Sequence, residues 1–205
     1  MSGWPAYLWR IGHVSAPLSL VPLALCGWSG RFDDPRREFR CLYCADAPAT
    51  CFRERLADLR PDVEALAAIG GPSPPVAMSS RFRAANALSA GRLEPLPVRV
   101  ADLFSPETRR EVTERYATLL SSFGVQYLDL AETMAREPRA LTQAVSRALY
   151  EHGYDAIRYP SLLDGRPSWA LFEGRAWLGR VGEDLDLTYA QPDFAWVAGE
   201  YNIAL

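Results

Sequence analysis

Apolar residues recur at helical spacing most clearly between residues 138 and 152. Every third or fourth position there is apolar, which gives a helix one apolar face. Gly153 follows directly and is expected to end the helix, because glycine adopts the left-handed conformation of a helix C-terminus at little cost. The predicted apolar face consists of Leu141, Ala144, Val145, Ala148 and Leu149.

Two further helices are predicted from the residues that begin them. Ser105 is a suitable N-cap and Pro106 fits the first helical position, so a helix should run from there to about residue 122. Asp46 is a candidate N-cap for another helix, whose body is expected over residues 50–59.

Short apolar segments bounded by turn residues predict strands. These segments are residues 6–13, 38–45, 96–104, 125–130, 154–161 and 168–172, and alternating apolar positions in the last 30 residues predict an edge strand. Strands and helices mix without strict alternation, which is typical of an α+β fold with mixed β-sheets flanked by helices. No glycine-rich dinucleotide fingerprint follows the first strand, which argues against a Rossmann site.

The segments between these elements are expected to be irregular. Residues 14–29 are apolar and rich in Pro, Ser and Gly, which indicates a buried loop, and residues 30–37 form a polar turn. Residues 70–95 look like an irregular insertion that begins with a turn cluster over residues 70–75, and a short helix or a loop is expected within residues 77–90. A C-terminal extension follows residue 173.

Length and charge favour a single domain and limit the ligands that it can bind. The 205 residues suit one domain, and the formal net charge of −3 without a basic block argues against direct nucleic-acid binding. A small anion held by a few arginines remains compatible with this charge. The N-terminus lacks a signal-like segment, and the apolar stretch at residues 16–27 is too short for a membrane span, so a cytoplasmic location is expected. The oligomeric state is left open.

The chain contains no lysine, so all 22 basic residues are arginine. This excludes a Schiff-base lysine and a phosphate-loop lysine. A codon bias toward arginine explains most of the surplus. A few of these guanidinium groups remain available for bidentate binding of phosphate.

The cysteines raise the question of a metal site. Cys41 and Cys44 have the C-x-x-C spacing of zinc ligands, and Cys51 lies close by. Residues 38–45 are predicted as a strand, however, on which positions three apart face opposite sides. We therefore expect buried thiols rather than a metal site or disulfides.

Three segments, taken together, point to one protein family. The first comprises Trp9-Arg10 and Gly30-Arg31-Phe32, the second runs from Leu42 to Thr50 and leads to Glu54, and the third runs from Gly153 to Ser161 and is followed by Ala170-Leu171-Phe172. In this order they resemble the RES family, which is named after a recurring arginine, glutamate and serine. The resemblance covers about residues 9–60 and 96–173.

The resemblance implies an ADP-ribosyltransferase-like fold in a single domain over residues 1–205. It further implies an enzyme that uses NAD as substrate and breaks its nicotinamide–ribose N-glycosidic bond by hydrolysis or phosphorolysis, without a metal. It implies the toxin half of a toxin–antitoxin pair, with a helix-turn-helix antitoxin as partner. The insertion and the extension leave two alternatives open: transfer of ADP-ribose to a protein or small molecule, and a non-catalytic module that binds a nucleotide or a partner.

Three residues are the candidate catalytic groups that the resemblance implies. Glu54 would stabilise the cationic ribose that forms as neutral nicotinamide leaves, and Arg31 would clamp the pyrophosphate, with Arg10 as a second clamp. Ser161 would hydrogen-bond the nicotinamide amide or a ribose hydroxyl. The alternatives are a surface glutamate beside Arg53, solvated arginines and a turn serine.

Two aromatic residues complete the candidate site. Tyr43 would stack on the positively charged nicotinamide ring, and Phe32 would line the same pocket. The alternatives are a half-buried strand tyrosine and a core phenylalanine. Arg36, Arg37 and Arg40 are expected to be solvated.

Overall fold

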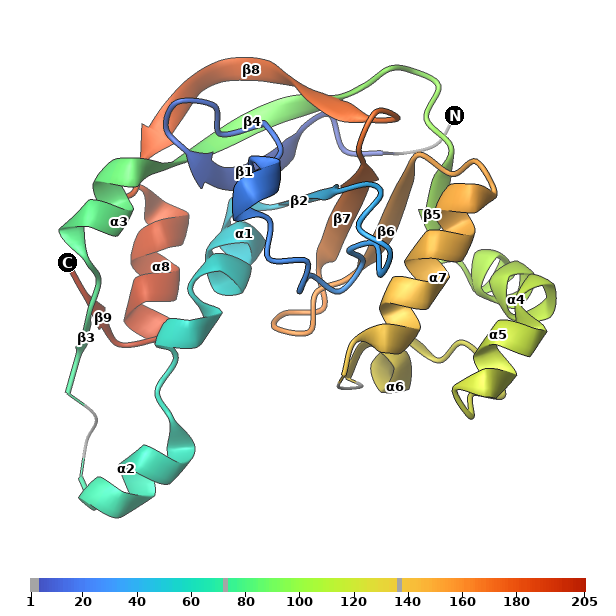
Figure 1. The fold of residues 1–205 in the computed structure, drawn as a ribbon. Coiled ribbons are helices and arrows are strands. Elements are labelled where there is room, and N and C mark those ends of the chain that lie inside the picture. Colours follow the sequence, from blue (N-terminus) through green and yellow to red (C-terminus); the bar gives the residue numbers. More distant parts are fainter. Residues whose placement is uncertain (1–3, 72–73, 136–137) are drawn as a thin grey trace.

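The computed structural model describes residues 4–71, 74–135 and 138–205 and shows a mixed α+β fold around one large sheet (Figure 1). The described strands are β1 (Leu8–His13), β2 (Cys41–Ala45), β3 (Val76–Ala77), β4 (Asn86–Glu94), β5 (Val100–Asp102), β6 (Ala156–Pro160), β7 (Pro167–Phe172), β8 (Trp177–Asp186) and β9 (Ile203–Ala204). Within the described chain, seven of them form a sheet in the order β5-β6-β7-β2-β1-β4-β8. The β5–β6 pair is parallel and the other pairs are antiparallel, while β3 and β9 form a separate parallel pair. The predicted α+β class with a mixed sheet is confirmed.

The helices lie beside this sheet in two groups, except for the helix Val63–Ile69, which projects away from it (Figure 1). They are α1 (Pro48–Arg55), α2 (Val63–Ile69), α3 (Ser80–Ala85), α4 (Pro106–Arg115), α5 (Ala117–Ser122), α6 (Leu130–Ala135), α7 (Ala140–Glu151) and α8 (Pro192–Glu200), with short 3-10 turns at Leu23–Leu25 and Ala57–Leu59. Figure 1 shows α4 to α7 beside β5 and β6, and α1, α3 and α8 beside β1 and β4. The two helical groups therefore leave a boundary between them near the middle of the sheet.

The buried side chains form three clusters that follow this arrangement. One cluster joins the group around α7 to the sheet and includes Leu149 and Phe172. A second joins α1 and α8 to the sheet and includes Phe52 and Phe194, whose ring centroids lie 5.3 Å apart. A third, on the other side of the strands, includes Trp169. Because strand side chains alternate between faces, one sheet supports cores on both sides.

The strongest sequence predictions are confirmed. The pattern over residues 138–152 corresponds to α7, whose residues Leu141, Val145 and Leu149 are buried, and Gly153 takes a φ of 81°. The helix predicted after Ser105 is present as α4 and α5, and the Ser105 side chain accepts a hydrogen bond of 3.1 Å from the backbone N–H of Thr108.

Two local predictions are wrong. Residues 125–130 are not a strand, because Asp129 accepts a hydrogen bond from the backbone N–H of Glu132 and begins α6. Asp46 is not the N-cap of α1. Ala47 holds that position, while the Asp46 carboxylate accepts a hydrogen bond from the Trp169 indole at 2.5 Å.

The expectation of an irregular segment over residues 70–95 is wrong for residues 86–94, which form β4 and pair with β1 on one side and β8 on the other. Residues 80–85 form α3, which agrees with the short helix expected as one alternative within residues 77–90. Small residues such as Ala87, Ser89 and Gly91 are buried in β4, so the strand carries no clear alternation of large apolar side chains. Pro72 and Ser73, in the predicted turn cluster, lie outside the described residues.

Two expectations about exposure are corrected as well. The loop at residues 14–29 is largely exposed, with Leu25 at 74% and Leu23 at 63% exposure. Arg40 is not solvated, because its guanidinium binds both carboxylate oxygens of Glu173 and also donates to the carbonyl of Val21 at 2.7 Å. The edge strand predicted in the last 30 residues is present as β8 at the edge of the sheet, and α8 and β9 follow it.

Candidate active site

A large cavity opens where the central sheet splits between β1 and β2. In the described part of the chain these strands pair at one position, Trp9 opposite Ala45, whereas β1 continues alongside β4 and β2 alongside β7. The cavity measures about 1230 Å³ and is lined by residues 10–13 of β1 and residues 43–45 of β2. Consecutive residues of each strand line it because the strands present their edges, rather than one face, to the gap. This volume exceeds the range of about 300–1,000 Å³ that is usual for small-ligand pockets.

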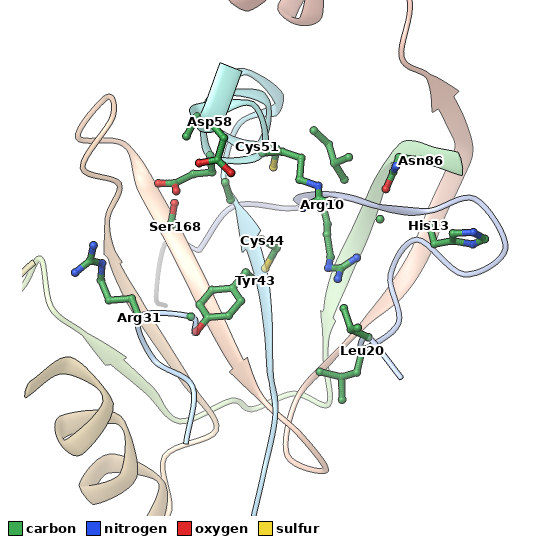
Figure 2. Close-up of a pocket in the computed structure, with 18 of the residues that line it drawn as sticks. Arg10, His13, Leu20, Arg31, Tyr43, Cys44, Cys51, Asp58, Asn86 and Ser168 are labelled. Carbon is green, nitrogen blue, oxygen red and sulfur yellow. The ribbon is translucent and has the colours of Figure 1, made fainter. Parts of the chain in front are cut away.

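Strands β2, β6 and β7 form the floor of one part of this cavity. Ala45 lies opposite Ser168 on β7, and Ser168 lies opposite Tyr159 on β6. Residues opposite each other in adjacent strands point to the same face, so these side chains share one side of the sheet with Tyr43. Figure 2 shows Tyr43, Ser168 and Arg31 around this floor.

The glutamate and the serine of the resemblance contact each other directly. The Ser161 hydroxyl donates a hydrogen bond of 2.5 Å to Glu54 Oε1, although 107 positions separate the two residues. The same hydroxyl accepts from the backbone N–H of Leu163 at 3.1 Å, which fixes its orientation. Ser161 is 3% exposed, whereas Glu54 is exposed and lines the cavity. The structure thus holds one carboxylate oxygen of Glu54 in place at the cavity wall.

Helix α1 carries Glu54 and is held by ion pairs on its buried side. The Arg53 guanidinium lies 3.4 Å from Asp164 Oδ2 and 2.5 Å from Glu200 Oε2, and it stacks over the Trp196 ring at 4.3 Å. Thr50 donates a hydrogen bond of 2.8 Å to the same Asp164 oxygen. The Arg53 side chain is therefore buried and bound to Asp164 and Glu200, so it does not form a surface ion pair with Glu54.

Arg31 projects from a turn that is closed by a buried carboxylate. Asp33 accepts hydrogen bonds from the backbone N–H of Gly30 at 2.6 Å and from the Tyr43 hydroxyl at 2.9 Å. A Cβ atom at Gly30 would lie 2.5 Å from that hydroxyl, so the turn requires glycine there. Arg31 is half-buried and lines the cavity. Because the turn is anchored to β2, the position of Arg31 is set by the sheet.

Helix α7 braces the same turn from the other side. The Gln143 side chain donates to the Gly30 carbonyl at 3.0 Å, and the Ser146 hydroxyl donates to the Phe32 carbonyl at 2.7 Å. Tyr43 accepts from the backbone N–H of Phe32 at 2.9 Å, so its hydroxyl is fully engaged. Burial raises the pKa of Tyr43 well above its ordinary value, and this tyrosine stays neutral.

Phe32 belongs to the core and does not line the cavity. It is 1% exposed, and its ring packs against Tyr159 with the centroids 4.6 Å apart. Its predicted role as a pocket residue is therefore corrected. Its backbone serves the site by holding Tyr43.

Tyr159 lines the cavity together with Glu54 and Arg31. Burial raises the pKa of the Tyr159 hydroxyl well above its ordinary value, so this tyrosine stays neutral.

Arg10 lines another part of the same cavity. Its guanidinium donates to the carbonyl of Pro17 in the loop that follows β1, and burial lowers its pKa. In the view of Figure 2, Arg10 and Arg31 lie on either side of Tyr43. Arg10 therefore combines a position at the cavity with a hydrogen bond that holds the loop.

The cavity contains more positive than negative groups. Arg55, Arg60 and Arg139 line it in addition to Arg10 and Arg31, while its carboxylates in the described chain are Glu54 and Asp58. No local sequence pattern marks these three arginines or Ser168, since the position of each depends on contacts between distant segments. Tyr159 lies in a family-like segment but was not assigned a role there.

Cys44 on β2 and Cys51 on α1 are buried thiols, whereas Cys41 on β2 and Cys26 in the loop after β1 are half-buried. Cys41 donates to the carbonyl of Phe32 at 3.0 Å, Cys51 donates to that of Trp9 at 2.9 Å, and burial raises the pKa of both thiols. Among residues 4–71, 74–135 and 138–205, no group of three or more Asp, Glu, His or Cys side chains is arranged to hold a metal ion. None of the helices that the structure describes is both long and apolar enough to cross a membrane.

The split mixed sheet and its arginine-rich cavity define an α+β protein with one large charged cavity. A family model described as the RES domain matches residues 7–190, and the chain therefore belongs to the RES family. The match extends over residues 70–95 and beyond residue 173. No curated protein matches the sequence.

A solved structure is similar to this chain in fold. It is the crystal structure of the M. tuberculosis MbcT–MbcA toxin–antitoxin complex, with 17% sequence identity, a TM-score of 0.55, and coverage of 97% of this chain and 90% of that chain. The two proteins share the fold over nearly their whole length.

Proposed function

We propose that this protein is an NAD-consuming enzyme that cleaves the nicotinamide–ribose N-glycosidic bond. The observation that carries the proposal is the hydrogen bond between Ser161 and Glu54 at the wall of a cavity rich in arginine. Membership of the RES family supports it, because the arginine, glutamate and serine of the family motif all reach this cavity or its wall.

The residues have distinct roles in this reaction. Glu54 faces the ribose and stabilises the positive charge that develops as the C–N bond breaks. The bonding electron pair leaves with the ring nitrogen, so neutral nicotinamide departs without a proton donor. Ser161 is a positioning residue: by binding Oε1 of Glu54 it leaves Oε2 directed to the cavity.

A nucleophile then completes the reaction. An oxygen of water or phosphate forms a bond to the ribosyl carbon on which the charge developed, and water loses one proton to solvent in doing so. Arg31 binds the pyrophosphate, since a guanidinium matches two phosphate oxygens at once. Tyr43 offers its ring face to the nicotinamide.

We also propose that the protein acts as the toxin of a toxin–antitoxin pair. The similarity in fold to MbcT motivates this, as that protein was solved in complex with its antitoxin MbcA. An antitoxin with a helix-turn-helix domain would be its partner. Expression of the chain alone should arrest growth, and co-expression of the gene beside it should relieve the arrest.

The direct test is release of nicotinamide from NAD by purified protein, with and without phosphate. Wild-type protein should release nicotinamide, and Glu54→Gln should lower kcat by at least about 100-fold while the thermal midpoint stays close to wild type. Labelled NAD distinguishes the acceptor: label in ADP-ribose indicates water, in its phosphate ester indicates phosphate, and in protein indicates transfer. No release from folded wild-type protein would sink the proposal.

A further inference from the structure

Ser168 is a buried hydroxyl at the cavity whose hydrogen bonding the protein leaves incomplete. The residue is 2% exposed and lines the cavity, yet none of the described residues places a donor or acceptor within hydrogen-bonding distance of its Oγ. A buried hydroxyl without a partner costs about 1–3 kcal/mol, and such groups in native proteins call for an explanation.

The neighbouring hydroxyls are used differently. Thr50 donates to Asp164, Ser146 donates to Phe32, and Ser161 donates to Glu54. Each of these hydroxyls donates its hydrogen bond to another group of the protein. Ser168 makes no such bond and therefore has a free donor and a free acceptor.

Strand pairing places Ser168 next to the catalytic pair. The backbone N–H of Ser161 donates to the carbonyl of Arg166 at 2.8 Å, which closes the β6–β7 hairpin two residues before Ser168. In the hairpin, Ser168 lies opposite Tyr159, which also lines the cavity, and Ser161 at the end of the same hairpin binds Glu54. Ser168 and Glu54 consequently belong to the same region of the cavity, and Figure 2 shows the Ser168 side chain directed into it.

The residues around Ser168 indicate which kind of ligand group can bind to its hydroxyl. Its neighbours across the strands are Ala45 and Tyr159, and Ser161 at the end of the same hairpin binds the Glu54 carboxylate. The negative charge of Glu54 disfavours a phosphate at this position. A neutral group that both donates and accepts, or accepts alone, fits a hydroxyl of this kind.

We propose that Ser168 is a substrate-binding residue that hydrogen-bonds a neutral polar group on the nicotinamide riboside half of NAD, a carboxamide or a ribose hydroxyl. This inference rests on the proposed function, since it takes the cleaved half of the substrate to lie beside Glu54. Ser168 acts with Glu54 at the same end of the ligand, while the arginines bind its phosphates.

The test separates substrate binding from a structural role. Ser168→Ala removes the hydroxyl, and Ser121→Ala is the matched control, because Ser121 is exposed and does not line the cavity. Ser168→Ala should lower kcat/KM for NAD about 3- to 10-fold, the effect of one hydrogen bond, while Ser121→Ala should leave it unchanged. In the absence of NAD, the thermal midpoint of Ser168→Ala should equal or exceed that of wild type, because an unpaired buried hydroxyl is removed.

Two analogues identify the group that Ser168 contacts. One carries an acetyl group in place of the carboxamide, and the other lacks the 2′-hydroxyl of the nicotinamide ribose. If Ser168 contacts the group that an analogue has lost, wild-type protein should bind that analogue more weakly than NAD. Ser168→Ala should discriminate less between that analogue and NAD. A wild-type preference that Ser168→Ala retains in full for both analogues would overturn the inference.

Failure of this inference is distinguishable from failure of the proposed function. If wild type releases nicotinamide and Ser168→Ala does so with the same kcat/KM, the Ser168 inference is wrong and the proposed function stands. If wild type releases none, the proposed function is wrong, and calorimetric Kd values for NAD decide the inference. Equal Kd values for wild type and Ser168→Ala, or no binding to wild type, would overturn it.

Discussion

At the scale of single residues, the site depends on hydroxyls and carboxylates that hold one another. Ser161 binds Glu54, and Tyr43 binds Asp33, which closes the turn that carries Arg31. Each functional side chain therefore has a neighbour that limits its rotation. Catalytic groups held in this way lose little freedom when the substrate binds.

Arg31 provides the prediction at this scale. Arg31→Ala should raise KM for NAD at least about 10-fold, because a charged hydrogen bond to phosphate contributes about 1.5–3 kcal/mol. Arg36→Ala is the control, since Arg36 is exposed and does not line the cavity. Steady-state kinetics of nicotinamide release measures both variants. Equal KM values for wild type and Arg31→Ala would remove Arg31 from the binding site.

At the scale of elements, helix α1 is the part that must be placed accurately. It packs on α8 through Phe52 and Phe194 and is tied to the loop after β6 through Arg53 and Asp164. The same loop begins with Ser161. One set of buried contacts therefore aligns Glu54 and Ser161, the two residues of the proposed site.

Arg53→Met tests this role of α1. Removing one member of a buried ion pair costs about 3–5 kcal/mol, because the partner carboxylates lose their compensation. Arg115→Met is the matched control: Arg115 pairs with Glu111 on the surface of α4, and such pairs contribute about 0.2–1 kcal/mol. Urea unfolding at neutral pH gives both values. Similar losses in the two variants would contradict the buried anchoring of α1.

At the scale of the whole molecule, the sheet is one continuous structure that opens at its middle. The strands on either side of the split are each held by a different helical group. Arg40 and Glu173 join β2 to the end of β7, far from the cavity residues in α1. They offer a measure of global stability that leaves Glu54 untouched.

The Arg40–Glu173 pair predicts a pH dependence of stability. Hydrogen bonds from Arg40 lower the pKa of Glu173 below its ordinary value of about 4.5, so its stabilising contribution is fully present above that pH and is lost as pH falls through the lowered pKa. Glu173→Gln should therefore be less stable than wild type at pH 7, and the difference should narrow below about pH 4.5. Urea midpoints between pH 7 and pH 3 measure this. If the difference in urea midpoint between wild type and Glu173→Gln stays constant from pH 7 to pH 3, the Glu173 carboxylate does not stabilise the fold in the way proposed.

Local features of the fold were predictable from the chain alone. The apolar face of α7, its end at Gly153 and the N-cap Ser105 each depend on interactions within a few residues, so spacing and residue type are sufficient. The ordered family motifs also placed Glu54 and Ser161 in one site, and their hydrogen bond now shows them together.

Other features required the folded molecule. The opening between β1 and β2, the position of Ser168 opposite Tyr159, and the burial of Phe32 all follow from pairing between segments far apart in the chain. Strand register and side-chain burial arise from such long-range pairing. A short stretch of neighbouring residues in the sequence does not predict which distant segments pair. The 22 arginines show the same division: their number is plain in the sequence, whereas only the tertiary structure separates Arg31 at the cavity from Arg53 in the interior.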